Sequence, residues 1–230
     1  MMKVIAHRGA RADEPENTIR GIKRAFTCGA DAVEVDVRLS KDGEVMVIHD
    51  DTLERTTNGV GSVREKTSAE LKLLDAGKGE EISMLSEVLS LFKGSEIELV
   101  VEMKEEGIEE RVVQEIEDVG MAEEKVAISS FFHPSLLKIK ELEPKIKTGV
   151  IISSLPVFPV NLARDANANV IFPKYPRLNG ELVEKAHENE IDVYPWVINR
   201  RKDLEKVIEL EVDGIVTDDS CFIRRLIDGE

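Results

Sequence analysis

The segment Lys3-Val4-Ile5-Ala6-His7-Arg8-Gly9-Ala10-Arg11 decides between the two folds that the rest of the chain allows. Its β-branched, apolar start predicts a buried strand. A single glycine follows that strand, whereas the dinucleotide-binding turn of an open, doubly wound sheet has the pattern G-x-G-x-x-G. The segment therefore argues against the open sheet and favours a closed barrel.

Short β-branched runs alternate with longer helical patterns along the chain, which is typical of a parallel sheet with helical connections. We predict strands at 3–6, 32–37, 98–103, 126–130, 147–152, 169–172, 192–197 and 213–217. We predict helices near 17–28, 83–92, 108–119, 134–142, 159–167, 179–189, 202–210 and 219–228. Eight strand–helix units predict an α/β fold, the (β/α)8 TIM barrel, whose usual length is ~250 residues.

One stretch interrupts the alternation after the second strand. Ser40–Gly43 predicts a tight turn, because an Asp-Gly pair readily adopts positive φ. Glu44–Asp50 predicts a return strand, and the polar, glycine-containing sequence that follows has no periodicity. Residues 40–80 are therefore interpreted as a small insertion over the active-site end of the barrel. We interpret residues 1–230 as a single domain.

The composition is that of a globular protein, with 42% hydrophobic and 33% charged residues. The formal charge of −15 argues against nucleic-acid binding, which depends on positive charge. Cys28 and Cys221 are too few for a disulfide scaffold and are interpreted as isolated thiols. Neither a membrane-spanning run nor a signal peptide is evident. We expect a soluble, cytoplasmic protein without stable membrane association.

Three carboxylates fall on the strands predicted to end at the barrel mouth. Glu34 and Asp36 are two residues apart, so their side chains point to the same side of the second strand, and Glu102 lies on the third. Converging carboxylates repel each other unless a cation joins them. Oxygen ligands favour a hard divalent cation, namely Mg²⁺, Ca²⁺ or Mn²⁺. Solvated carboxylates at strand ends are the alternative interpretation.

Basic side chains stand beside these carboxylates. His7 and Arg8 follow the first strand, Lys104 follows Glu102, and His49 closes the predicted return strand. Histidine side chains have an ordinary pKa near neutral pH, which suits proton transfer, and cationic side chains suit the binding of an anionic substrate.

Several other residues allow two interpretations. Trp196, near the end of the seventh strand, either packs in the core or lines a substrate cleft. Asp218 either positions a phosphate ligand or caps the last helix, and Asn17 and Thr18 are expected to cap the first helix. His133 and His187 are interpreted as surface or capping residues.

The apolar segment 155–160 (Leu-Pro-Val-Phe-Pro-Val) follows the strand at 147–152. It forms either an apolar wall for the alcohol part of a substrate or an interface patch, and we expect the wall.

Several motifs together resemble those of the glycerophosphodiester phosphodiesterase family. They are H-R-G-A-R-A-D-E-P-E-N-T (7–18), E-V-D-V (34–37), K-D-G-E-V-M-V-I-H-D (41–50), V-E-M-K (101–104), S-S-F (129–131), W-V-I-N (196–199) and V-T-D (216–218). They appear in the family's order and span nearly the whole chain. One departure is Ser220, at a position where the family usually has proline.

The resemblance implies a TIM barrel that hydrolyses small glycerophosphodiesters to glycerol 3-phosphate and an alcohol. It implies that His7 and His49 are the acid–base pair and that Arg8 and Lys104 bind phosphate. It implies a divalent cation on Glu34, Asp36 and Glu102, with Mg²⁺ favoured over Ca²⁺ or Mn²⁺, and Trp196 is a further candidate for substrate contact. Attack by the glycerol 2-hydroxyl and attack by water both remain open.

Two other functions remain as alternatives. The first is a related phosphodiesterase acting on lysophospholipids or phosphoinositides. The second is a non-catalytic barrel that binds phosphorylated ligands, which would require the loss of a histidine or carboxylate. The oligomeric state is not predicted.

Overall fold

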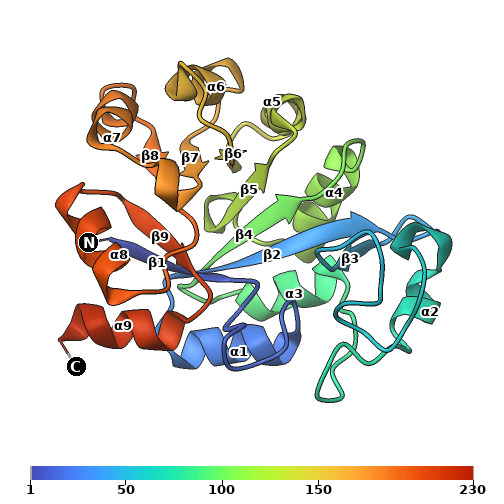
Figure 1. The fold of residues 1–230 in the computed structure, drawn as a ribbon. Helices are drawn as coiled ribbons and strands as arrows, with labels where there is room; N and C mark the ends of the chain where they lie inside the picture. The colour runs from blue at the N-terminus through green and yellow to red at the C-terminus, as the bar shows by residue number, and fades with distance from the viewer. Residues whose placement is uncertain (1, 230) are drawn as a thin grey trace.

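Eight parallel strands form a nearly closed barrel in the computed structural model, which describes residues 2–229 (Figure 1). Their order around the barrel is β8-β7-β6-β5-β4-β2-β1-β9. The strands are β1 (Lys3–His7), β2 (Ala32–Leu39), β4 (Glu98–Met103), β5 (Val126–Ser130), β6 (Lys147–Ile152), β7 (Val170–Pro173), β8 (Asp192–Val193) and β9 (Gly214–Thr217). A bridge between Trp196 and Val216 joins the segment after β8 to β9. The predicted TIM barrel is confirmed.

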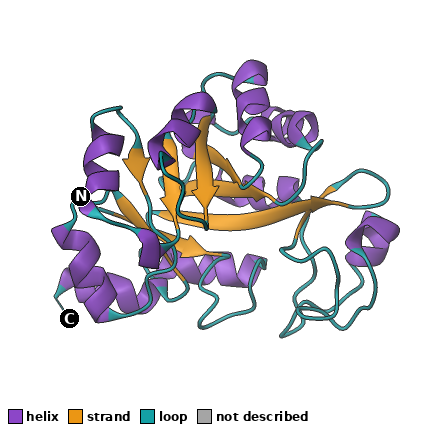
Figure 2. Ribbon diagram, turned by 45° about the horizontal axis from the view of Figure 1, so that its top comes forward, coloured by secondary structure: helices purple, strands orange, loops and turns teal. Residues whose placement is uncertain are grey.

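Helices cover the outside of the strands (Figure 2). They are α1 (Ile19–Thr27), α3 (Leu85–Phe92), α4 (Glu109–Val119), α5 (His133–Leu142), α6 (Pro159–Asp165), α7 (Gly180–His187), α8 (Arg201–Glu209) and α9 (Ser220–Asp228). Each begins near the carboxyl end of the preceding strand and runs back along the barrel. Within residues 2–229, no helix has both the length and the apolar character needed to cross a membrane.

The eighth unit differs from the prediction, because β8 covers two residues where we predicted a strand at 192–197. Pro195 has no backbone N–H and cannot donate to a strand ladder. Its carbonyl still accepts from Val216 N at 3.0 Å, so the segment stays attached to β9 without continuing as a strand.

Side chains alternate between two apolar layers. Val33 and Val35 of β2 point outward into the large core beneath the helices. Ala32 points inward, into a smaller core that fills the barrel. Because the alternation continues, Glu34 and Asp36 also point inward, nearer the carboxyl end of the strand. The inner core is apolar at its base and becomes charged where the strands end.

Residues 40–84 leave the barrel after β2 and return at α3. They contain β3 (Val45–Val47), which pairs antiparallel with β2, then η1 (Val63–Glu65) and α2 (Ser68–Leu71). The predicted turn is present, with Gly43 at a φ of 84°, but the return strand is shorter than predicted. The segment has its own core of Met46, Ile48, Leu53, Val63, Leu71 and Ile82. In Figure 1 it lies to one side of the barrel, away from α6 and α7.

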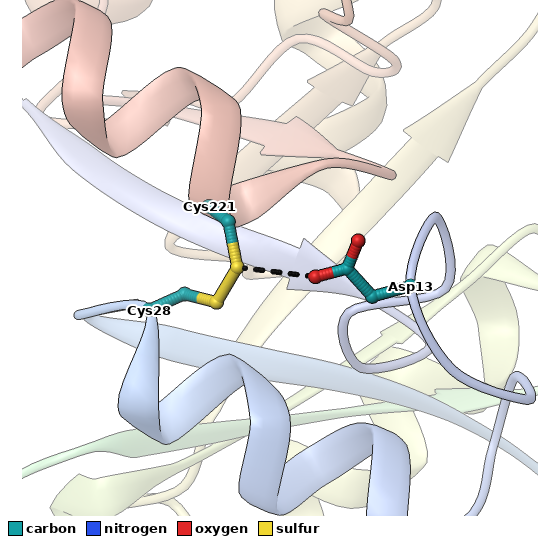
Figure 3. A group of neighbouring side chains, drawn as sticks. All are labelled: Asp13, Cys28 and Cys221. Carbon is teal, nitrogen blue, oxygen red and sulfur yellow. Dashed lines mark hydrogen bonds between the residues drawn. A yellow bond between two sulfur atoms is a disulfide. The ribbon is translucent and has the colours of Figure 1, made fainter.

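The interpretation of Cys28 and Cys221 as isolated thiols is wrong, because the two form a disulfide (Figure 3). Cys28 ends α1 and Cys221 lies in the first turn of α9. The two residues are 193 positions apart, and only closure of the barrel brings them together. A carboxylate oxygen of Asp13 lies 3.4 Å from the Sγ atom of Cys221. Since both sulfurs are used in the bond, no thiolate is available here for a metal.

Reduction of the Cys28–Cys221 disulfide is expected to lower the melting temperature by about 10 °C or more. In the chain-entropy model, a disulfide that closes so long a loop destabilises the unfolded state by on the order of 5 kcal/mol. For a chain of this size, each kcal/mol of stability corresponds to about 2–4 °C in melting temperature. Thermal melts with and without dithiothreitol measure the shift. A Cys28→Ser, Cys221→Ser double variant should melt at the reduced temperature in both buffers. Equal melting temperatures for oxidised and reduced protein would contradict this expectation.

Candidate active site

The candidate active site lies at the carboxyl ends of β1, β2 and β4. Strand pairing places His7 beside Glu34 and Asp36 beside Glu102. Residues two apart on a strand share a face, so the pairing stacks the four side chains on the inner side of neighbouring strands. The structure thus brings together groups that are up to 95 positions apart in the sequence.

Glu34, Asp36 and Glu102 form a buried carboxylate cluster. Each offers an oxygen, and these oxygens lie within 4.8 Å of one another. Burial, followed by repulsion from Asp36 and Glu102, raises the pKa of Glu34 well above its usual value. Burial and the charge of Asp36 also raise the pKa of Glu102, to about 7.

Two oxygens of the carboxylate cluster are not satisfied by hydrogen bonds within residues 2–229. Glu34 Oε1 and Asp36 Oδ1 are buried and accept no hydrogen bond. A buried acceptor without a donor is costly, and the cost rises when it carries charge. A divalent cation would coordinate both oxygens and would offset the repulsion among the three carboxylates. The cluster therefore fits an oxygen-ligated metal.

A sharp turn after β1 carries Arg8 across the carboxylate cluster. Arg8 and Gly9 have φ values of 58° and 80°. A Cβ atom on Gly9 would lie 2.7 Å from the backbone carbon of Gly21, so the turn requires glycine. The turn lets Arg8 N donate to Glu34 Oε2 at 2.9 Å, and its guanidinium Nε lies 3.0 Å from Asp36 Oδ2.

Lys104 completes the polar side of the site. Its Nζ atom pairs with Glu102 and lies 3.5 Å from Asp36 Oδ1. With Arg8 it places two cations on the cluster, where each could also meet the anionic group of a ligand.

His7 is held by a carboxylate. Its Nδ1 lies 2.7 Å from Asp218 Oδ1. Burial would raise the pKa of Asp218, but the hydrogen bonds from His7 and Asn199 and the charges of His7 and Arg11 together lower it to about 2. The ionised carboxylate accepts, so Nδ1 donates and Nε2 is left for the cavity. Asn199 Nδ2 donates to the other oxygen of Asp218 at 2.7 Å and fixes its orientation.

His49 is held in the same way, by the insertion. Its Nδ1 lies 2.5 Å from Asp50 Oδ1, and Asp50 also accepts from Arg55. Arg55 in turn pairs with Glu16 at 2.8 Å, and Glu16 accepts from Arg8 at 2.9 Å. Burial lowers the pKa of His49, which favours its neutral form near neutral pH. A chain of ion pairs thus joins His49 to Arg8, which lies over the carboxylate cluster.

A cavity of about 220 Å³ opens over these groups. One side is polar and is lined by His7, Arg8, Glu34, His49, Glu102 and Lys104. The other side is mainly apolar and is lined by Ser129, Phe131, Ile151, Phe172, Trp196 and Val216. Trp196 therefore lines the cleft, its ring edge-to-face with that of Phe131 at 6.0 Å between centroids. The shape suits a small ligand with a charged centre and a less polar end.

The expected apolar wall from segment 155–160 is a wrong prediction. Leu155, Val157 and Phe158 are exposed and absent from the cavity lining. The wall comes instead from inward-facing residues of the strands and of the loops directly after them, such as Phe172 of β7. Strand periodicity could have indicated Phe172, because it lies two residues after the inward-facing Val170.

Two residues near the site were assigned to helix capping or left open by the sequence. The predicted cap of α1 is confirmed for Thr18, whereas Asn17 does not cap the helix. Asn17 instead donates to Asp36 Oδ2 at 2.8 Å and accepts from Asp36 N at 3.1 Å, which orients that carboxylate. Asp218 contacts His7, while its neighbour Asp219 caps α9. His133 and His187 are absent from the cavity lining.

The chain is similar to known proteins of one family. Residues 7–221 match the model of the glycerophosphoryl diester phosphodiesterase family. A glycerophosphodiester phosphodiesterase from Caldanaerobacter subterraneus is 42% identical over 97% of both chains. One from Bacillus altitudinis is 36% identical over 95% of both chains.

Solved structures share the fold. That of an Oleispira antarctica phosphodiesterase, in complex with the product sn-glycerol 3-phosphate, superposes with a TM-score of 0.91 at 29% identity, covering 99% of this chain and 97% of that one. Residues 7–221 include the carboxylate cluster, both carboxylate-held histidines and the cavity lining. The chain belongs to the glycerophosphoryl diester phosphodiesterase family and is a phosphodiesterase that acts on glycerophosphodiesters.

Proposed function

We propose that this enzyme hydrolyses glycerophosphodiesters to glycerol 3-phosphate and an alcohol, using a divalent cation and two histidines. The observation that carries the proposal is the buried carboxylate cluster, in which two oxygens accept no hydrogen bond, set between two carboxylate-held histidines. The product bound to the Oleispira relative supports a small phosphorylated ligand. We propose that residues 1–230 form one catalytic domain.

Glu34, Asp36 and Glu102 would hold the cation, and we propose Mg²⁺, with Ca²⁺ or Mn²⁺ as alternatives. Three carboxylate oxygens are hard ligands, and a cation that keeps further positions for water or substrate oxygens fits such a set. When bound, the cation would act as a Lewis acid on a phosphoryl oxygen. Asn17 keeps Asp36 in place by two hydrogen bonds.

Arg8 and Lys104 would bind the phosphodiester. Negative charge builds on the equatorial oxygens of phosphorus as a nucleophile attacks, and fixed cations stabilise that charge. Both residues face the cavity, and the ion pairs with Glu16 and Glu102 hold their charged ends in position before substrate arrives.

His7 and His49 would exchange the protons. One Nε2 accepts the proton of the nucleophile and the other donates to the departing alkoxide. The nucleophile is either the glycerol 2-hydroxyl, which gives a cyclic phosphate that water then opens, or water itself. Both routes use the same two histidines. Trp196 and the neighbouring apolar side chains would contact the carbon-bound part of the substrate.

Hydrolysis of glycerophosphocholine and glycerophosphoethanolamine tests the proposal. Release of glycerol 3-phosphate is followed with Mg²⁺, Mn²⁺, Ca²⁺ or EDTA. We expect release with one or more of the metals and none with EDTA. Equal release in EDTA would remove the cation from the mechanism.

Replacing Asp218 with asparagine is expected to lower kcat roughly 10²-fold, within the 10²–10⁴-fold that acid–base catalysis supplies. The amide cannot hold the His7 ring with a charged acceptor. Because Asp218 is a positioning residue that does not touch the carboxylate cluster, the metal-dependent rise in melting temperature should persist.

Asp219→Asn is the matched control for Asp218→Asn. Asp219 is adjacent in sequence, but its carboxylate caps α9 by accepting a hydrogen bond from Phe222 N at 2.9 Å. Asparagine also caps helices well, so kcat and stability should both stay near those of the unmodified protein. Similar kcat values for Asp218→Asn and Asp219→Asn would show that Asp218 does not position His7.

A further inference from the structure

The loop between β6 and α6 presents apolar side chains to solvent beside the active site. Leu155, Val157 and Phe158 are 64%, 84% and 66% exposed. They follow the carboxyl end of β6, so they stand at the mouth of the barrel. Large apolar side chains gathered on one exposed loop indicate contact with another apolar phase or partner.

Unpaired cations lie on the neighbouring loops. Arg177 follows β7, and Arg201 and Lys202 begin α8, and all three are exposed. Within residues 2–229, none of the three has an ion-pair partner. The protein carries a net charge of −15, so carboxylates are plentiful, yet none is placed against these three groups.

The mouth is therefore divided by charge. The loops after β5 to β8, taken with the first three residues of α8, hold five basic residues and one acidic residue, Asp203; the ranges are 131–132, 153–158, 174–179 and 194–203. The insertion at 40–84, on the other side of the mouth, has ten acidic and six basic residues. Figure 1 shows the insertion away from α6 and α7.

A surface groove joins Leu155 and Arg177 to the edge of the cavity through Lys174. Leu155 lines a surface groove with Lys174 and Arg177. The Nζ of Lys174 lies 5.6 Å from the centre of the Trp196 ring, and Trp196 lines the active-site cavity. We call Leu155, Val157, Phe158, Arg177, Arg201 and Lys202 the apolar-basic rim.

We propose that the apolar-basic rim docks reversibly on an anionic phospholipid bilayer, with the active-site mouth facing the lipid. Apolar side chains that enter the headgroup region and cations that meet anionic headgroups are the two contacts that hold proteins at a membrane surface. The acidic insertion is repelled by the same surface, which selects one orientation. The inference rests on the proposed function only in taking the cavity as the active site.

Docking of this kind is weak and reversible. The sequence predicts no stable membrane association, and a rim of three apolar and three basic side chains is far smaller than a membrane anchor. Each basic residue near an anionic surface strengthens binding roughly five-fold at physiological ionic strength. The docking should therefore weaken as salt rises.

Vesicle flotation tests the docking. Vesicles of phosphatidylglycerol and phosphatidylcholine are compared with vesicles of phosphatidylcholine alone, using the full-length oxidised protein. We expect the protein to float with the anionic vesicles and far less with the neutral ones. The variants Leu155→Ser/Val157→Ser/Phe158→Ser and Arg177→Gln/Arg201→Gln/Lys202→Gln should each lose at least ten-fold in apparent affinity.

Leu142→Ser/Ile208→Ser is the matched control. These two apolar residues are 41% and 51% exposed and lie near the ends of α5 and α8 that point away from the mouth. This variant should float like the unmodified protein. No flotation of the unmodified protein, or flotation retained by both rim variants, would overturn the proposal.

Hydrolysis of dissolved glycerophosphocholine separates this inference from the proposed function. Rim variants should keep the unmodified rate, since no rim residue lines the cavity. Loss of flotation with this activity intact supports the docking, whereas an inactive unmodified protein that still floats would count against the proposed function alone. Sedimentation velocity tests the other occupant, a second copy of this chain: a dimer abolished by the rim substitutions, without vesicle binding, would overturn the proposal.

Discussion

Replacing Glu34 with glutamine is expected to abolish metal-dependent turnover and to raise the melting temperature of the metal-free protein. Stabilisation of transition-state charge by a cation is worth several kcal/mol, so kcat/KM should fall at least ~10³-fold. Glutamine keeps the shape and can still accept from Arg8 N, as Glu34 does at 2.9 Å.

The stabilising effect follows from the burial of Glu34. The residue is 5% exposed, and burial together with the charges of Asp36 and Glu102 raises the pKa of its carboxyl group. A neutral side chain removes that repulsion, which we expect to raise the melting temperature of the metal-free protein. Loss of activity combined with gain of stability is not what a misfolded variant shows.

Thermal melts in EDTA and in excess Mg²⁺, with Mn²⁺ and Ca²⁺ as further arms, measure both effects. The unmodified protein should melt at a higher temperature when the cation is bound. A cation at a hundred times its Kd adds about 2.7 kcal/mol to the free energy of unfolding. Glu34→Gln should show no such rise. Glu184→Gln, on the exposed side of α7, is the control and should leave activity and the metal response unchanged. A full metal-dependent rise in Glu34→Gln would place the cation elsewhere.

Replacing either histidine with alanine is expected to lower kcat on glycerophosphocholine by roughly 10²–10⁴-fold. His7 and His49 each direct Nδ1 at a carboxylate, which leaves Nε2 of both for proton transfer. Neither belongs to the carboxylate cluster, so both variants should keep the metal-dependent rise in melting temperature.

A 4-nitrophenyl ester of glycerol phosphate distinguishes the two roles. Its leaving group departs as a stable anion and needs no proton. The variant that lacks the general acid should recover most of its rate on this ester, whereas the variant that lacks the base should stay slow. His187→Ala is the control, because His187, the last residue of α7, pairs with Asp213 and is absent from the cavity lining. Full activity of His7→Ala or His49→Ala on glycerophosphocholine would exclude that histidine from catalysis.

The sequence predicted the barrel because its signals are local. Alternating β-branched runs and amphipathic helices depend on neighbours a few residues away. The predicted ends of most strands therefore lie close to the observed ends. The three carboxylates could be placed on one face because strand periodicity fixes the direction of Glu34 relative to Asp36. The strand predicted at 192–197 was too long, because its β-branched content favoured a strand while Pro195 lacks the N–H that a strand ladder needs.

Contacts between distant segments escaped prediction for a physical reason. Asp218 reaches His7 only because β9 pairs with β1 at barrel closure, and nothing local separates it from the capping residue Asp219. Asn17 looked like a cap because it precedes a helix, and only the turn at Arg8 and Gly9 brings it to Asp36. The Cys28–Cys221 pair depends on the same closure.

The Cys28–Cys221 disulfide also changes the connectivity of the molecule. The backbone from Cys28 to Cys221 becomes a covalent ring with two short tails, and all strands except β1 lie within that ring. A single cut by a protease at the exposed tip of the insertion, near Val60, would open the ring without releasing a fragment. The nicked chain would keep its mass under oxidising conditions and separate into two pieces only after reduction.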